Sequence, residues 1–278
     1  MPVFDTPEPI AVTLEFEIGT ARISASKRAD TVVEVRPANG ADDADVRAAQ
    51  QTEVTYVNGR LTVKGPRKRS PFGRPGSLEV SVELPSGSQV QGTSPLGDFL
   101  CEGPLGDCRL RTSAGDIRVE EAATVTLKTS HGDIHLGRAT GDAEIIGSGR
   151  VEAGRLGGAA TVKNGNGETT IDETVGHLKA LASNGRITVG LAHTSVDARS
   201  ANGAIRIDEI VSGRITLATS SGDLEVGVRE STAAWLDVKT GIGAVHNHLT
   251  PSDSPEGAAE TVEVRARTSM GDITIRRP

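Results

Sequence analysis

The sequence reads Thr129-Ser130-His131-Gly132-Asp133-Ile134-His135-Leu136 near its middle, and this stretch is one copy of a motif that recurs along more than half of the chain. Each copy has a small or polar residue, a glycine, often an aspartate, and then an apolar residue. Neighbouring glycines lie 17 to 21 residues apart, except for a last step of 28. They are Gly97, Gly115, Gly132, Gly149, Gly167, Gly185, Gly203, Gly222, Gly243 and Gly271. A period of about 18 residues indicates one structural unit stacked on itself.

Each period contains two strands with the glycine in the turn between them. Counted from the glycine, positions −7, −5, +2 and +4 are apolar, as in Val125, Leu127, Ile134 and Leu136. Alternation with a period of two is typical of a strand with one buried face. Several turns read Asn-Gly, which suits a tight turn because both residues tolerate positive φ.

The constant phase of the strands relative to the glycine predicts a parallel coil. Antiparallel hairpins would reverse the inward pattern in every other strand, and a three-sided left-handed helix would show a six-residue sub-repeat that is absent from the sequence. We therefore predict an all-β fold, a β-helix-like parallel β-solenoid with right-handed coils of about 18 residues spaced about 4.8 Å apart.

One coil breaks the apolar pattern, because Glu144 occupies position −5 before Gly149 and Ile145 lies beside it. We predict a one-residue bulge between Gly141 and Gly147 that turns Ile145 inward and Glu144 outward.

Residues 1–85 lack the repeat and are predicted to form an N-terminal β-rich cap, with residues 86–278 forming the solenoid. The cap should contain a short helix over Ala41–Gln51, which begins with acidic residues, and a hairpin around Asn58-Gly59. Its other strands are expected at Ala11–Ile18, around a turn at Gly19, and at Thr31–Arg36 and Leu78–Leu84. Solenoids need such caps, because an open coil exposes unpaired backbone.

The C-terminal part contains the 28-residue step. We read Pro251–Gly257 as a polar insertion within it, and the last strand is followed by Arg276 and Arg277. Charges at this position would discourage end-to-end stacking.

Four segments read Thr-Ser-x-Gly-Asp followed by Ile or Leu, and with the opening Glu17–Ile23 they resemble the bacterial Toastrack family, also described as putative adhesins with β-strand repeats. The segments are Thr112–Ile117, Thr129–Ile134, Thr219–Leu224 and Thr268–Ile273. The resemblance implies a non-catalytic solenoid, linked in some relatives to cell-envelope stress systems, and supplies no catalytic residues. Some relatives also have a membrane segment that this sequence lacks.

Composition restricts the function further. The net charge of −7 argues against a nucleic-acid partner, and aromatic residues are only 2% of the chain. The start of the sequence suggests no signal peptide, and no apolar run is long enough to span a membrane. Cys101 and Cys108 match no zinc or redox spacing and occupy inward positions, so we expect buried free thiols and a cytoplasmic protein.

Asp98, Asp116 and Asp133 follow the glycine in three successive coils and are the weak candidates for a metal site. Stacked carboxylates repel each other, which Ca²⁺ would relieve, but the ligand set is sparse. We favour solvated aspartates that accept hydrogen bonds from their own turns. No metal or other cofactor is predicted.

Two histidine pairs, His131 with His135 and His246 with His248, each have the spacing of one strand face, but no further ligand completes either site. A basic loop could contact an anion or a partner, although we favour a solvated loop. Its charged residues are Arg67, Lys68, Arg69 and Arg74.

Two functions from different classes remain open. The first is a non-enzymatic solenoid that binds or scaffolds other proteins, adhesin-like and linked to envelope stress, with its protein partner unidentified and a homo-oligomer left open. The second is a carbohydrate-active β-helix enzyme, a polysaccharide lyase or hydrolase. Such enzymes need clustered charges and aromatic rings on which sugars stack. Besides four phenylalanines, this sequence has only Trp235 and Tyr56. We favour the first.

Overall fold

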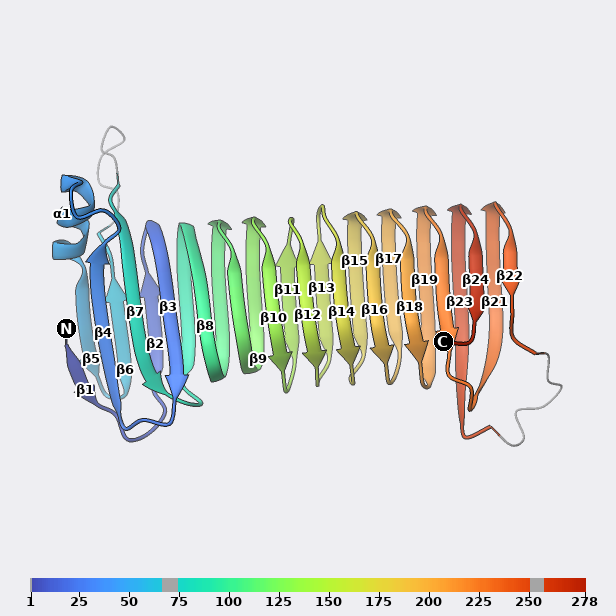
Figure 1. The fold of residues 1–278 in the computed structure, drawn as a ribbon, viewed down its shortest axis with the longest axis horizontal. Helices are drawn as coiled ribbons and strands as arrows, with labels where there is room; N and C mark the ends of the chain where they lie inside the picture. The colour runs from blue at the N-terminus through green and yellow to red at the C-terminus, as the bar shows by residue number, and fades with distance from the viewer. Residues whose placement is uncertain (1, 67–74, 251–257) are drawn as a thin grey trace. The chain divides into compact units, whose positions relative to one another are not determined.

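The computed structural model describes residues 2–66, 75–250 and 258–278. These residues form 24 strands and one helix, so the all-β prediction is confirmed (Figure 1). The chain divides into two compact units, Met1–Thr140 and Gly141–Pro278, which we describe separately. The basic loop and the polar insertion of the sequence analysis lie outside the described residues.

The first unit contains the helix and the strands β1 to β10. Their bounds are β1 Val3–Asp5, β2 Ala11–Glu15, β3 Ile18–Ser26, β4 Asp30–Pro37, α1 Asp43–Gln51, β5 Glu53–Val57, β6 Arg60–Lys64, β7 Ser77–Pro85, β8 Gln89–Ala114, β9 Ile117–His131 and β10 Ile134–Ala139. Parallel pairing joins β6 to β2, β2 to β8, β7 to β3, β3 to β8, β8 to β9 and β9 to β10. The predicted parallel stacking is therefore present in this unit.

The first part of this unit contains the helix, which the sequence predicts, and antiparallel pairs β1 with β4 and β4 with β7. β5 and β6 form the expected hairpin, with Asn58 and Gly59 at φ of 50° and 74° in the turn. The carboxylate of Asp42 caps α1 by accepting the Ala44 N–H at 2.8 Å. The predicted strand Ala11–Ile18 is wrong at its end, because a new strand begins at Ile18 and continues through Gly19, paired with β7 and β8.

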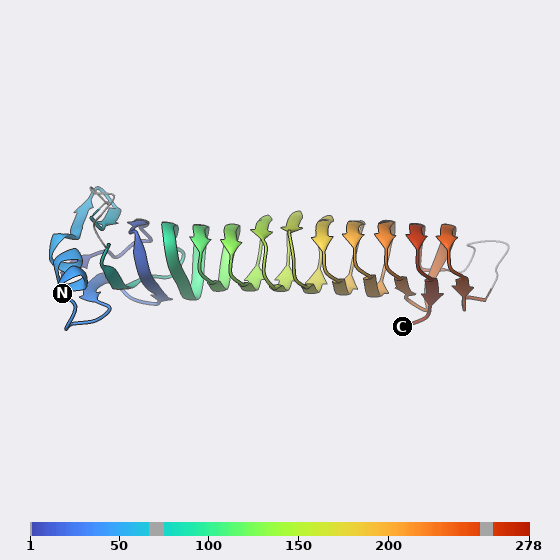
Figure 2. The ribbon, with the colours of Figure 1, turned by 90° about the horizontal axis from the view of Figure 1, so that it is seen from above.

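The second unit contains two strands per coil in two parallel layers (Figure 2). Strands that precede a turn glycine form the first layer, in the order β11 Ala143–Gly147, β13 Ala160–Asn164, β15 Leu178–Asn184, β17 Val196–Asn202, β19 Gly213–Ser221, β23 Glu260–Met270 and β21 Thr232–Ile242. Strands that follow the glycine form the second layer, in the order β12 Val151–Leu156, β14 Thr169–Thr174, β16 Ile187–Ala192, β18 Ile205–Ile210, β20 Leu224–Val228, β24 Ile273–Arg276 and β22 Val245–Asn247. Every one of these neighbours is parallel, so the coil prediction is confirmed within this unit.

The last two coils do not follow sequence order. β23 pairs with β19 on one side and β21 on the other, so the final coil lies between two earlier ones. The Thr268 hydroxyl donates to the carbonyl of Gly222 at 3.0 Å, and the Thr240 hydroxyl donates to that of Gly271 at 2.8 Å. The expectation that Arg276 and Arg277 end the stack is therefore wrong, and β21 with β22 form its last coil.

The core of the second unit is a single thin layer of aliphatic side chains between the two strand layers. Ile205, Ile207, Ile215 and Leu217 are fully buried, each at 0% exposure. Side chains of this size fill the space without large aromatic rings, which agrees with the 2% aromatic content.

The predicted bulge in β11 is wrong, although the side-chain directions are right. Ile145 is buried and Glu144 is partly exposed, yet β11 pairs with β13 without a register shift. The change in the apolar pattern arises in the turn instead, which is one residue shorter than in the next coil. Residues 148–150 join β11 to β12, whereas residues 165–168 join β13 to β14. A shortened turn keeps every ladder hydrogen bond, which a bulge would interrupt.

Candidate functional site

The aspartates that follow the turn glycines have a structural contact. Asp116 donates its backbone N–H to Asp98 Oδ1 at 2.8 Å, and Asp133 donates to Asp116 Oδ1 at the same distance. The carboxylates of Asp98 and Asp116 therefore bind the backbone of the next coil, in place of the expected contact with their own turns. Across the described ranges, no three His, Cys, Asp or Glu side chains gather closely enough to hold a metal ion. Asp98 and Asp116 thus connect coils.

The histidine pairs are arranged differently from each other. His246 and His248 have exposed, stacked rings whose centroids are 6.5 Å apart. His131 is the last residue of β9 and His135 lies in β10, so the prediction that they share one strand is wrong because the glycine turn separates them.

Both cysteines are buried free thiols, as predicted. They are 1% and 0% exposed and lie opposite Val119 and Val125 of β9. The hydrogen bond between Cys101 and Cys108, together with burial, raises the pKa of the Cys101 thiol well above its usual range. A thiol held in this way is a poor nucleophile and metal ligand.

The two strand layers of the second unit carry different charges on their outward faces. The described strands of the first layer have seven basic and five acidic side chains, whereas those of the second layer have three and six. On the first layer the basic residues are Lys163, Lys179, Arg199, Arg214, Lys239, Arg265 and Arg267, and the acidic residues are Glu144, Asp197, Asp237, Glu260 and Glu263. On the second layer the basic residues are Arg155, Arg206 and Arg276, and the acidic residues are Glu152, Asp172, Glu173, Asp208, Glu209 and Glu225. We call the outward surface of the first layer the basic face.

A shallow groove crosses the basic face. In register across four strands lie Arg199, Ala218, Arg267 and Lys239, and the short side chain of Ala218 leaves space between the two guanidinium groups. Small residues form the rest of its floor, namely Ala182, Ala201, Ser220, Gly241 and Ser269. The groove therefore combines cationic walls with a nearly flat floor.

Neighbouring carboxylates hold most of the cations of the basic face in place. Asp197 pairs with Arg199 at 3.0 Å, and Asp237 pairs with Arg267 at 2.6 Å. The hydrogen bond from Arg267 lowers the pKa of Asp237, and the hydrogen bond from Arg214 lowers that of Glu263. Lys239 has no such ion pair among the described residues, so its ammonium group is available to a ligand.

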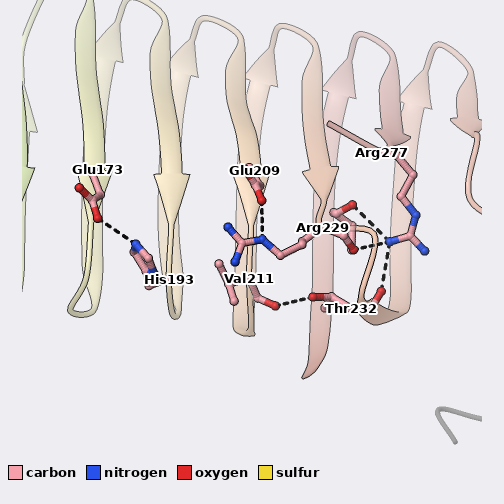
Figure 3. Close-up of polar contacts among 8 residues, drawn as sticks. Glu173, His193, Glu209, Val211, Arg229, Thr232 and Arg277 are labelled. Carbon is pink, nitrogen blue, oxygen red and sulfur yellow. Dashed lines mark hydrogen bonds and ion pairs between the residues drawn. The ribbon is translucent and has the colours of Figure 1, made fainter. Parts of the chain in front are cut away.

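A row of polar contacts follows one end of the strands in the second layer (Figure 3). Glu173 forms an ion pair with Arg155 at 3.3 Å and contacts His193 Nε2 at 2.9 Å. Further along, Glu209 pairs with Arg229. Charges of opposite sign on successive coils attract each other. The row is not evident from the sequence, because the paired residues are about one period apart. We read it as a stabilising contact between coils.

Arg277 ends this row (Figure 3). Its guanidinium group donates to the backbone carbonyls of Val228, Arg229 and Thr232. The Thr232 hydroxyl in turn donates to the Val211 carbonyl at 2.7 Å. These contacts fix the connection between β20 and β21, and so help to position β21, a strand of the basic face.

The structure does not bring the described members of the predicted site residues together into one catalytic or metal-binding cluster. Arg67, Lys68, Arg69 and Arg74 lie outside the described residues. The basic face was missed because its charges are spread over six coils, and the signal that could have found it is the outward strand position that they share. The only helix that the structure describes, α1, has 9 residues and cannot cross a membrane.

Comparison with known proteins gives a family match over almost the whole chain. The model of the family described as Toastrack DUF4097 matches residues 12–276. No curated protein sequence matches. A putative adhesin from Parabacteroides merdae aligns with a TM-score of 0.41 and 9% identity, covering 98% of this chain and 94% of that chain. A putative adhesin from Parabacteroides distasonis gives 0.35 and 13%, with 98% and 95% covered. A putative lipid-binding protein from the same species gives 0.26 and 11%, with 100% and 95% covered.

Proposed function

We propose a non-enzymatic binding function for this chain, which belongs to the Toastrack DUF4097 family. The binding surface is the basic face of the second unit, and the partner is a protein with an acidic surface. The observation that carries this proposal is the separation of charge between two regular strand layers in a chain whose net charge is −7. Complementary charge directs a partner to one face and away from the other.

The shape of the basic face supports a macromolecular partner. Its groove is shallow and is lined along several coils, from Leu181 and Arg199 to Lys239 and Arg267. Extended faces of this kind are what solenoids use to bind other proteins. Arginine is also enriched at protein interfaces, where its planar group contacts carboxylates in two-point geometry.

The finer parts of the proposal have separate supports. A scaffold or adhesin-like role in envelope stress is what the family resemblance implies. A cytoplasmic location is supported by Cys101 and Cys108, which are free thiols packed side by side in the core.

The polysaccharide lyase or hydrolase is the less favoured alternative. A general acid in such an enzyme needs a raised pKa. On the basic face, arginines lower the pKa of Asp237 and Glu263, which keeps both carboxylates ionised. The aromatic Trp235 is 56% exposed, and the guanidinium group of Arg265 lies 6.0 Å from the centre of its ring.

Site-specific photo-crosslinking in the native cells tests the proposal. A crosslinking amino acid replaces Thr216, on the outward side of β19, or its matched control Thr188, on the outward side of β16. We expect one defined acidic partner from position 216 and not from 188, and loss of that product when Lys179 and Arg199 are both changed to Glu. Equal products from both positions, or release of new reducing ends or unsaturated sugars from a polysaccharide panel, would contradict it.

A further inference from the structure

The last coil of the second unit is incompletely buried. Inward residues of the inner coils are closed off, with Val264 and Ala266 of β23 at 0% exposure, yet Leu236 and Val238 of β21 are partly exposed. Four of the eight exposed large hydrophobic residues that the structure describes belong to this coil or adjoin it. They are Trp235 at 56%, Ile242 at 68%, Val245 at 44% and Met270 at 55%. The coil therefore presents apolar surface that a partner would bury.

Among the described residues, β21 pairs with a neighbouring strand on one side only, so half of its backbone groups lack a strand partner. The Ile242 carbonyl accepts the Gly271 N–H at 2.9 Å, so the even-numbered residues of β21 bond to β23. Backbone groups alternate in direction along a strand, so the odd-numbered residues from Ala233 to Gly241 point their N–H and C=O groups to the open side. An open edge of this kind is a template for another strand.

We infer that this coil binds the same coil of a second copy, with the two β21 strands antiparallel about a two-fold axis through Val238. This interaction uses the edge of β21, whose Asp237 and Lys239 also lie on the basic face, and it goes beyond the proposed function, which needs no second copy of the chain. A symmetric pair uses the same patch on both copies, so the patch must be complementary to itself.

The axis follows from bonding and charge together. The backbone groups on the open side belong to odd-numbered residues, so an odd-numbered residue of one copy must lie opposite an odd-numbered residue of the other. Only a two-fold axis that passes through a residue, and not between two residues, gives this arrangement. An axis at Asp237 or at Lys239 would set like charges against each other. The axis at Val238 sets Asp237 of each copy opposite Lys239 of the other, and opposite charges at such positions stabilise a strand pair.

The same register covers part of the exposed apolar surface of this coil. Val238 meets its own counterpart, and Leu236 lies opposite Thr240 of the second copy, which extends the thin core across the axis. Trp235 lies opposite Gly241, where a glycine leaves room for an aromatic ring, an arrangement that also shields glycine in a strand.

Sedimentation equilibrium over a range of concentrations tests the inference. We expect a dimer for the natural chain and a dissociation constant raised about tenfold or more by Lys239→Asp, which sets aspartates against each other and removes no ion pair within the chain. Asp237→Lys should have the same effect, and the double variant Asp237→Lys/Lys239→Asp should restore the dimer because the opposed charges are exchanged. Asp197→Lys, which breaks a similar ion pair on the inner strand β17, is the matched control and should remain dimeric.

Two results would overturn the inference. One is a natural chain that stays monomeric at all concentrations. The other is a double variant that is folded by circular dichroism but remains as dissociated as the single variants. Crosslinking at Thr216 is unaffected by either result, so failure of the dimer and failure of the basic face can be told apart.

Discussion

Replacing Gly203 by alanine tests the packing of the turn glycines. Gly203 has φ of +149°, in a region that residues with a side chain rarely adopt. A Cβ there would lie 2.1 Å from the carbonyl oxygen of Gly185 in the preceding coil. The substitution therefore strains the backbone and also pushes two coils apart.

The magnitude follows from these two effects. Backbone strain of this kind costs about 1–3 kcal/mol, and forcing extra atoms into a packed site costs about 1–3 kcal/mol. We expect Gly203→Ala to lower the free energy of unfolding by about 2–5 kcal/mol, which is a large part of the ~5–15 kcal/mol of a typical domain.

Gly165→Ala is the matched control, because its φ is not in the positive region and the nearest atom to the added Cβ is Ser148 Oγ at 3.3 Å. A substitution of this type at a compatible site changes stability by about 1 kcal/mol or less. Urea unfolding followed by circular dichroism measures both variants. If the two variants unfold at the same urea concentration, the turn glycines are not packed as described.

Leu127→Ala should cost about 2–5 kcal/mol, since Leu127 is fully buried, while Glu144→Ala should cost about 0.5 kcal/mol or less; equal losses on urea unfolding would mean that the carboxylate is buried. Cys101 and Cys108 should react with a thiol reagent only after unfolding, and a fast reaction of the native protein would show that the core opens there. Calcium chelators should leave the melting temperature unchanged, because the aspartates beside the turn glycines bind backbone N–H groups; a drop that Ca²⁺ reverses would contradict this. Asp237 has a lowered pKa in the folded state, so its contribution is complete above its unfolded pKa near 3.8 and is lost as pH falls through the lower folded value; unchanged urea midpoints between pH 5 and about pH 2 would refute it.

The repeat predicted the coils because each period carries the same local information. The alternation around Gly203, with Ile205 and Ile207 on one side of the turn, fixes which side chains enter the core, and the structure buries both completely. The turn hydroxyls were visible as a pattern, but their role was not. Thr219 donates across to the Gly203 carbonyl of the preceding coil, at 3.0 Å, a contact between residues 16 apart.

The order of the last coils could not be predicted for a physical reason. Each coil offers its neighbour the same parallel register, so Thr219 could pair equally well with Thr240 or with Thr268. The sequence period says that coils stack but does not say which ones touch. The basic face was hidden for a related reason, because its charges become one surface only after the coils are stacked.

The position of the final coil has a consequence for how the chain is completed during synthesis. β21 and β22 leave the ribosome before β23 and β24, yet they pair with these strands and with no earlier ones in the structure. While β23 and β24 are still in the exit tunnel, the edge of β19 and β20 is open to the wrong coil, which fits it in the same parallel register. Correct assembly of this end therefore waits until β23 and β24 have left the tunnel. A premature stop before residue 258 would remove β23 and β24, which lie between the coil of β19 and β20 and the coil of β21 and β22. The coil of β21 and β22 would then lack the strands with which it pairs.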